Sequence, residues 1–139
     1  MTYKKIFLDS DILLDTLLKR EPFVIYSRVL FSDKIGNTGK LCTSALILAN
    51  IYYVISRNLN KQVAATSVKY LLGLVEILAF EGNHINSAIN SEHPDFEDCI
   101  QYFIAKQNNC DLIISRNTKH YKKFDIPVLT AEEYLRNIL

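Results

Sequence analysis

Hydrophobic residues along the chain occur either in short continuous runs or at helical spacing, and the two patterns alternate. The runs, which are typical of buried strands, cover residues 5–9, 41–43, 75–80, 111–114 and 127–129. Helical spacing predicts helices over residues 12–17, 22–35, 44–57, 61–72, 83–89 and 130–139. A further helix opens at Pro94 and carries the apolar stripe Phe96, Cys99, Ile100, Phe103 and Ile104. Strands alternating with helices of this length predict an α/β fold whose parallel sheet is covered on both faces.

Boundary residues sharpen several of these predictions. Pro22 is expected in the first turn of the second helix, which Gly36-Asn37 would end. Ser44, Asn60 and Thr130 are placed to cap the helices that follow them. Gly73 is placed to end the helix that Asn60 begins.

Length and composition favour one domain over residues 1–139, of which about half, 49%, are hydrophobic. A net charge of +1 excludes a polybasic nucleic-acid binder, so any contact with a nucleic acid must come from a local patch. The longest apolar stretch, residues 44–55, is interrupted by Asn50 and is too short to span a membrane. The first twenty residues lack the apolar core of a signal peptide. Three cysteines without C-x-x-C spacing indicate reduced core residues of a cytoplasmic protein.

Two acidic groups stand far apart in the sequence. Asp9 ends the first strand, where open α/β sheets bind ligands, and Asp95 and Asp98 share one face at the start of a helix. Taken singly, each acid is also explained as a cap or as a complement to the helix dipole. Carboxylates gathered at the edge of the core repel one another and lose hydration, and a divalent cation removes both penalties.

Two asparagines extend this hypothesis. Asn50 follows the spacing of Ile47, Ile51 and Val54, so it is expected to point inward, where it either binds backbone groups or lines the same pocket. Asn117 follows the strand at residues 111–114 and is expected at the same edge of the sheet.

A basic segment follows the same strand. Its charged residues, with Tyr121 among them, are Arg116, Lys119, His120, Lys122 and Lys123. Such runs are usually solvated surfaces, yet cations beside an acidic metal site also suit a polymer whose phosphates must be held. His120 is interpreted as an exposed loop residue.

These motifs together resemble the PIN-domain family of metal-dependent ribonucleases, and most closely its VapC-type toxin branch. The matching segments are residues 7–11, 44–46, 95–105 and 111–117, with 126–135 as the last strand and helix. The resemblance implies a three-layer α/β/α sandwich, an Mg2+ or Mn2+ site and single-stranded RNA as substrate. It also implies a homodimer and a small antitoxin protein as partners.

By position, the resemblance assigns catalytic and metal-binding roles to Asp9, Asp98 and Asp95, with Asn117 and Asn50 as further metal ligands. It assigns substrate contacts to Ser10, Ser115, Arg116 and Lys119. The sequence departs from the family at two positions: Asn50 stands where a second acid, usually Glu, is expected, and His120 stands where an Asp often follows the fourth strand.

Two other interpretations remain open. A degenerate PIN domain would bind RNA or a protein without cutting. The segment from Asp9 to Asp11 also resembles the haloacid-dehalogenase phosphatases, but that family would place Thr or Val where Leu13 stands.

Overall fold

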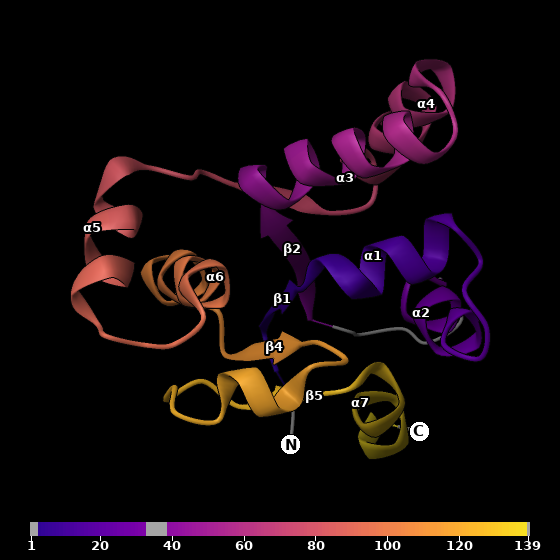
Figure 1. The fold of residues 1–139 in the computed structure, drawn as a ribbon. Coiled ribbons are helices and arrows are strands. Elements are labelled where there is room, and N and C mark those ends of the chain that lie inside the picture. The colour runs from indigo at the N-terminus through magenta and orange to yellow at the C-terminus, as the bar shows by residue number, and fades with distance from the viewer. Residues whose placement is uncertain (1–2, 33–38, 139) are drawn as a thin grey trace.

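The computed structural model describes residues 3–32 and 39–138, and five parallel strands form its centre (Figure 1). They are β1 (Lys5–Leu8), β2 (Lys40–Ser44), β3 (Glu76–Leu78), β4 (Leu112–Ile114) and β5 (Val128–Leu129). Their order across the sheet is β3-β2-β1-β4-β5, and each neighbouring pair is parallel. The central strand β1 contributes Ile6, Phe7 and Leu8, all fully buried, as expected for a sheet covered on both faces.

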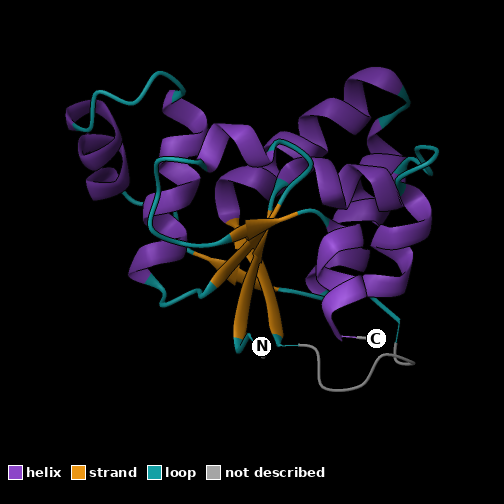
Figure 2. Cartoon of the chain, turned by 90° about the horizontal axis from the view of Figure 1, so that it is seen from below, coloured by secondary structure: helices purple, strands orange, loops and turns teal. Residues whose placement is uncertain are grey.

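Seven α-helices among the described residues cover this sheet in two layers. They are α1 (Ser10–Leu17), α2 (Val24–Leu30), α3 (Ala45–Asn58), α4 (Lys61–Leu72), α5 (Gly82–Asn90), α6 (Phe96–Gln107) and α7 (Ala131–Ile138). The pair α5 and α6 lies on one side of the sheet, and α1, α2 and α7 lie on the other (Figures 1 and 2). The predicted three-layer α/β/α sandwich with a parallel sheet is therefore confirmed.

Local sequence signals explain where most helices begin. The side chains of Ser44 and Asn60 accept hydrogen bonds from the backbone N–H groups of Ile47 and Val63, at 3.0 and 2.8 Å. Thr130 and Glu133 exchange side-chain and backbone bonds at the start of α7, which is a capping box. All three predicted caps are confirmed.

The second helix differs from the prediction at both ends. It begins at Val24 and ends at Leu30, so Pro22 lies in the turn before it and not in its first turn. The expected stop at Gly36-Asn37 falls outside the described residues. The predicted strand at residues 75–80 is also shorter, because β3 lies at the sheet edge and pairs only with β2.

The strand order indicates where in the sheet a ligand site is expected. β1 lies between β2 and β4, and the chain leaves toward opposite sides of the sheet at this point. Ligands of open α/β sheets bind at such a switch point, outside the carboxyl ends of the strands. Asp9 follows β1 there and Ser115 follows β4.

Two further expectations concern the rest of the molecule. All three cysteines are free and buried, as predicted, and the sulfurs of Cys42 and Cys110 lie 3.6 Å apart. Among the residues that the structure describes, no helix has the length and apolar character needed to cross a membrane.

Candidate metal centre

Asp9 is the buried acid at the centre of the site. Its Oδ1 accepts a hydrogen bond from the backbone N–H of Ser10 at 2.8 Å, so the residue caps α1. Its Oδ2 accepts bonds from the hydroxyl groups of Ser115, at 2.8 Å, and Tyr121, at 3.0 Å. The cap interpretation of Asp9 is therefore confirmed through Oδ1, while Oδ2 faces the acidic cluster and its role as a metal ligand stays a prediction.

Asp95 and Asp98 lie at the start of α6, and both carboxylates lie near the ring of His120. Oδ1 of Asp95 accepts from the backbone N–H of Asp98 at 2.9 Å, which makes Asp95 the cap of α6. The ring Nδ1 of His120 lies 2.9 Å from Oδ2 of Asp98 and 3.8 Å from Oδ2 of Asp95. One ligand atom from each of the three residues lies within 4.8 Å of the others, a spacing that one metal ion can span.

Tyr121 connects the two acidic groups. It lies at the end of the 3-10 helix η2 (Thr118–Tyr121), and its hydroxyl group is 3.0 Å from Asp9 and 3.3 Å from Asp98. Burial, followed by the negative charges of Asp9 and Asp98, raises the pKa of Tyr121 above its usual value. The group therefore stays a neutral donor between two carboxylates.

The charges in this cluster are poorly balanced. Burial raises the pKa of Asp98 to about 6, and the charge of Asp9 adds to the effect, while the bond with His120 opposes it. Glu97, which is exposed on the same first turn, also has a raised pKa because of desolvation and the charges of Asp9 and Asp95. Such a cluster favours either a proton or a cation.

Asp11 is a further carboxylate whose negative charge is poorly compensated. Its Oδ2 accepts a bond from the backbone N–H of Arg116 at 3.1 Å and lies 3.5 Å from the side-chain amide of Asn117. Its Oδ1 is buried, with no hydrogen-bond partner in residues 3–32 and 39–138. Burial and the charge of Asp9 raise its pKa to about 7. This unsatisfied oxygen and the oxygen-rich donor set fit a divalent cation.

Arg116 and Asp15 form an ion pair beside the cluster. Nε and Nη2 of Arg116 donate to the two carboxylate oxygens of Asp15 at 2.9 and 3.1 Å. Asp15 is 1% exposed, and the guanidinium also lies 4.2 Å from the ring centre of Phe23. The pair fixes the loop after β4 against α1.

The family model of the PIN domain matches residues 5–119 of the chain. The chain belongs to the PIN-domain family. Ribonuclease VapC1 of Aquifex aeolicus (strain VF5) is 32% identical to it over 96% of this chain and 95% of that protein.

Several solved structures of similar shape are VapC proteins or their complexes. The VapC20 toxin of Mycobacterium tuberculosis, which cleaves the sarcin-ricin loop, has a TM-score of 0.70 at 11% identity, over 86% of this chain and 95% of its own. VapBC2 of Rickettsia felis, bound to a promoter DNA fragment, has a TM-score of 0.68 at 16% identity, over 91% of this chain and 98% of its own. At these identities the likeness shows a shared fold.

Asn50 of this PIN domain does not point inward, so that expectation is wrong. The residue is exposed, while the buried face of α3 consists of Ile47, Leu48, Ile51 and Ile55. Each helical residue turns by roughly 100°, so burial of Leu48 rotates the inward face away from Asn50. A role of Asn50 as a metal ligand stays a prediction.

The residues expected to contact substrate differ in their exposure. Ser115 is fully buried, and its hydroxyl group donates to Asp9 and accepts from the backbone N–H of Asn117 at 3.0 Å. It therefore positions Asp9 and is not accessible to a substrate, which corrects the prediction. Lys119 is exposed, Ser10 is partly exposed, and Arg116 is held by Asp15.

Sequence reasoning missed three residues that build the site. Tyr121 was interpreted only as part of a basic segment, and Asp11 only as a neighbour of Asp9. Asp15 had a usable signal, since an acid among Ile12, Leu13 and Leu14 on one short helix requires a buried partner.

Proposed function

We propose that this PIN-domain protein is a divalent-metal-dependent ribonuclease that cuts single-stranded RNA and serves as the toxin of a toxin–antitoxin pair. The observation that carries the proposal is the acidic cluster at the switch point of the sheet, where Asp95, Asp98 and His120 are spaced to share one ion and Tyr121 joins Asp98 to Asp9. The 32% identity to Ribonuclease VapC1 supports the same reaction class. A small antitoxin protein is the proposed partner, by analogy with the VapBC complexes of similar fold.

The residues of the site have different roles in the proposed reaction. Asp9 and Asp98 would hold the ion, with Asp95 beside them and Asn117 near Asp11. A bound divalent ion lowers the pKa of a coordinated water and offsets charge on the phosphate. Tyr121 and Ser115 hold Asp9 in place, and the exposed Lys119 lies where a substrate phosphate can reach it.

We infer that the site prefers Mn2+ to Mg2+. The reason is His120, whose ring nitrogen lies among the carboxylates where the resemblance leads us to expect an Asp. Mg2+ is bound almost entirely through oxygen, while an imidazole ligand is better tolerated by transition metals.

The two departures from the family also support a second candidate function. Because Asn50 carries no charge and is exposed, the site has fewer carboxylates than the resemblance implies. A PIN domain with weakened metal binding would act as an RNA- or protein-binding module. Homodimer formation and a cytoplasmic location are further proposals, the latter supported by three free cysteines.

The experiment that separates the two functions is cleavage of a labelled single-stranded RNA in the presence of Mn2+. Wild type is compared with Asp9→Asn and Asp98→Asn, and Asp125→Asn serves as the control because this exposed acid pairs with Lys106 outside the cluster. The ribonuclease proposal requires cutting by wild type and the control and its loss in both site variants. A folded wild type that binds RNA without cutting it would instead establish the binding module.

A further inference from the structure

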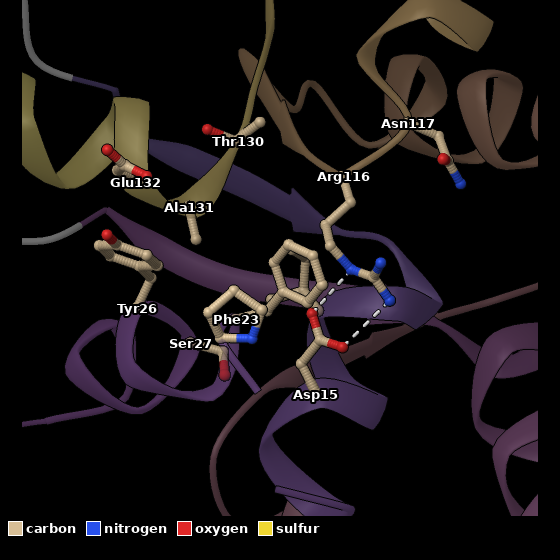
Figure 3. Close-up of a pocket in the computed structure, with 11 residues that line it drawn as sticks. Asp15, Phe23, Tyr26, Ser27, Arg116, Asn117, Thr130, Ala131 and Glu132 are labelled. Atoms are coloured by element: carbon tan, nitrogen blue, oxygen red, sulfur yellow. Dashed lines mark hydrogen bonds and ion pairs between the residues drawn. The ribbon is translucent and has the colours of Figure 1, made fainter. Parts of the chain in front are cut away.

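A pocket of about 370 Å³ lies beside the acidic cluster, between α1, α2 and the start of α7 (Figure 3). Figure 3 shows Tyr26 and Arg116 on opposite sides, with Phe23 between them. Asn117 and Thr130 also line it. Its volume lies near the lower end of the range for small-molecule sites, so it can enclose a small planar group.

Aromatic surface dominates one wall of this pocket. The side chain of Phe23 is 38% exposed although it is large and apolar. The guanidinium of Arg116 stacks on its ring at 4.2 Å. An aromatic ring and a guanidinium plane are the two protein surfaces on which unpaired bases stack.

The charges around the pocket are already balanced. Asp15 neutralises Arg116 through two hydrogen bonds, and Glu132 binds Arg136 at 2.9 Å. A phosphate group would therefore find little net positive charge here. A guanidinium carries five N–H donors, so Arg116 can donate further hydrogen bonds beyond the two to Asp15. The side-chain amide of Asn117 also lines the pocket. Flat apolar walls with a few polar groups suit an uncharged heteroaromatic ring.

The pocket is also next to the proposed reaction centre. Arg116 and Asn117 follow Ser115 directly, and the backbone N–H of Arg116 donates to Asp11 at 3.1 Å. The same short segment therefore borders the acidic cluster with its backbone and the pocket with its side chains. A group held in the pocket lies beside whatever the cluster holds.

We propose that this pocket binds one unpaired nucleobase of the RNA strand, next to the phosphate held at the acidic cluster. The inference rests on the proposed ribonuclease function and deepens it. A base can enter only when it is unpaired and unstacked, so the pocket makes the enzyme specific for single-stranded segments. The stacked pair of Phe23 and Arg116 supplies the flat surface for the base, and Asn117 also lines the pocket.

The test measures binding of a short fluorescent single-stranded RNA by anisotropy, in EDTA so that no cutting occurs. A series of oligonucleotides carries one abasic nucleotide at each position in turn. Wild type is compared with Phe23→Ala and Phe23→Tyr, which retains the ring. Tyr53→Ala on α3 is the control, since Tyr53 is 59% exposed and outside the pocket.

We expect Phe23→Ala to weaken binding about 5- to 100-fold, the effect of losing one stacked base, while Phe23→Tyr and Tyr53→Ala stay near wild type. One abasic position should weaken wild type to a similar degree and should cost Phe23→Ala nothing further. This lack of additivity excludes a general loosening of Arg116. If wild type binds RNA but the abasic series affects both proteins equally, the pocket proposal is wrong and the ribonuclease proposal stands. If wild type binds no RNA in EDTA, the pocket proposal is wrong, and the cleavage assay with Mn2+ decides the ribonuclease proposal separately.

Discussion

Asp9 and Asp98, which lie 89 positions apart in the sequence, share one hydrogen-bond donor, the hydroxyl group of Tyr121, at 3.0 and 3.3 Å. A hydroxyl group has a single proton, so it can donate fully to only one of the two carboxylates at a time. The other carboxylate then lacks part of its compensation. From this relationship we expect a cation to stabilise the two acids.

Tyr121→Phe is predicted to lower the free energy of unfolding by about 1–2 kcal/mol in EDTA, because a buried donor is lost. The loss should be smaller with Mn2+ present, since the ion then compensates both carboxylates. Urea denaturation with and without Mn2+ measures the difference. Tyr134→Phe is the control, because that buried hydroxyl group faces the backbone of Gly39 and its loss should not depend on the metal. Equal metal dependence in the two variants would contradict the prediction.

Local signals were sufficient for most of the fold. Ser44, Asn60 and Thr130 cap helices through bonds to residues three positions away, so their roles are visible in the sequence. The buried strands were visible as continuous apolar runs. The second helix was predicted, but its bounds were not: it begins at Val24 without a side-chain cap that the sequence could reveal, and it ends at Leu30.

The site was only partly predictable, since its contacts join distant segments. The acids Asp9, Asp95 and Asp98 could be proposed because each lies at the cap or in the first turn of a helix. Tyr121 could not, because its position depends on how the loop after β4 folds into η2. Asn50 was wrongly predicted to point inward, because the spacing of only three apolar residues defines the buried face of a helix to within about one position.

His120→Ala is predicted to weaken Mn2+ binding about 10- to 100-fold, the range seen when a group supporting metal ligands is lost. His120→Asp should instead raise the affinity for Mg2+ relative to Mn2+, because it restores an all-oxygen donor set. Thermal shift titrations with each ion give both affinities without measuring activity. An unchanged ratio of the two affinities in His120→Asp would place His120 outside the metal site.

Asp11 predicts an unusual pH dependence of stability. Its pKa is raised from 3.8 in the unfolded chain to about 7. Between these values the folded protein holds a proton that the unfolded chain has lost, so the free energy of unfolding falls as pH rises through this window. In EDTA, Asp11→Asn should be as stable as wild type near pH 4 and more stable by about 1–3 kcal/mol at pH 8.

The control for this pH dependence is Asp125→Asn. The hydrogen bonds from Tyr102 and Lys106 lower the pKa of Asp125, so its contribution has the opposite sign and is lost as pH falls. Urea denaturation of the three proteins at several pH values measures both trends. A difference between wild type and Asp11→Asn that does not grow with pH would show that Asp11 ionises normally.

The ion pair of Asp15 and Arg116 predicts a non-additive pair of variants. Asp15 is 1% exposed while the side chain of Arg116 is 31% exposed, so removing the acid leaves a partly buried cation without its partner. We expect Asp15→Ala to lower the free energy of unfolding by about 2–4 kcal/mol, somewhat below the cost for a fully buried pair. Adding Arg116→Met should recover part of this loss, because the unpaired charge is then gone while packing against Phe23 is kept. Urea denaturation of the two single variants and the double variant measures the coupling. Additive losses would mean that Asp15 and Arg116 contribute independently, and the loop after β4 would then be held mainly by its backbone bond to Asp11.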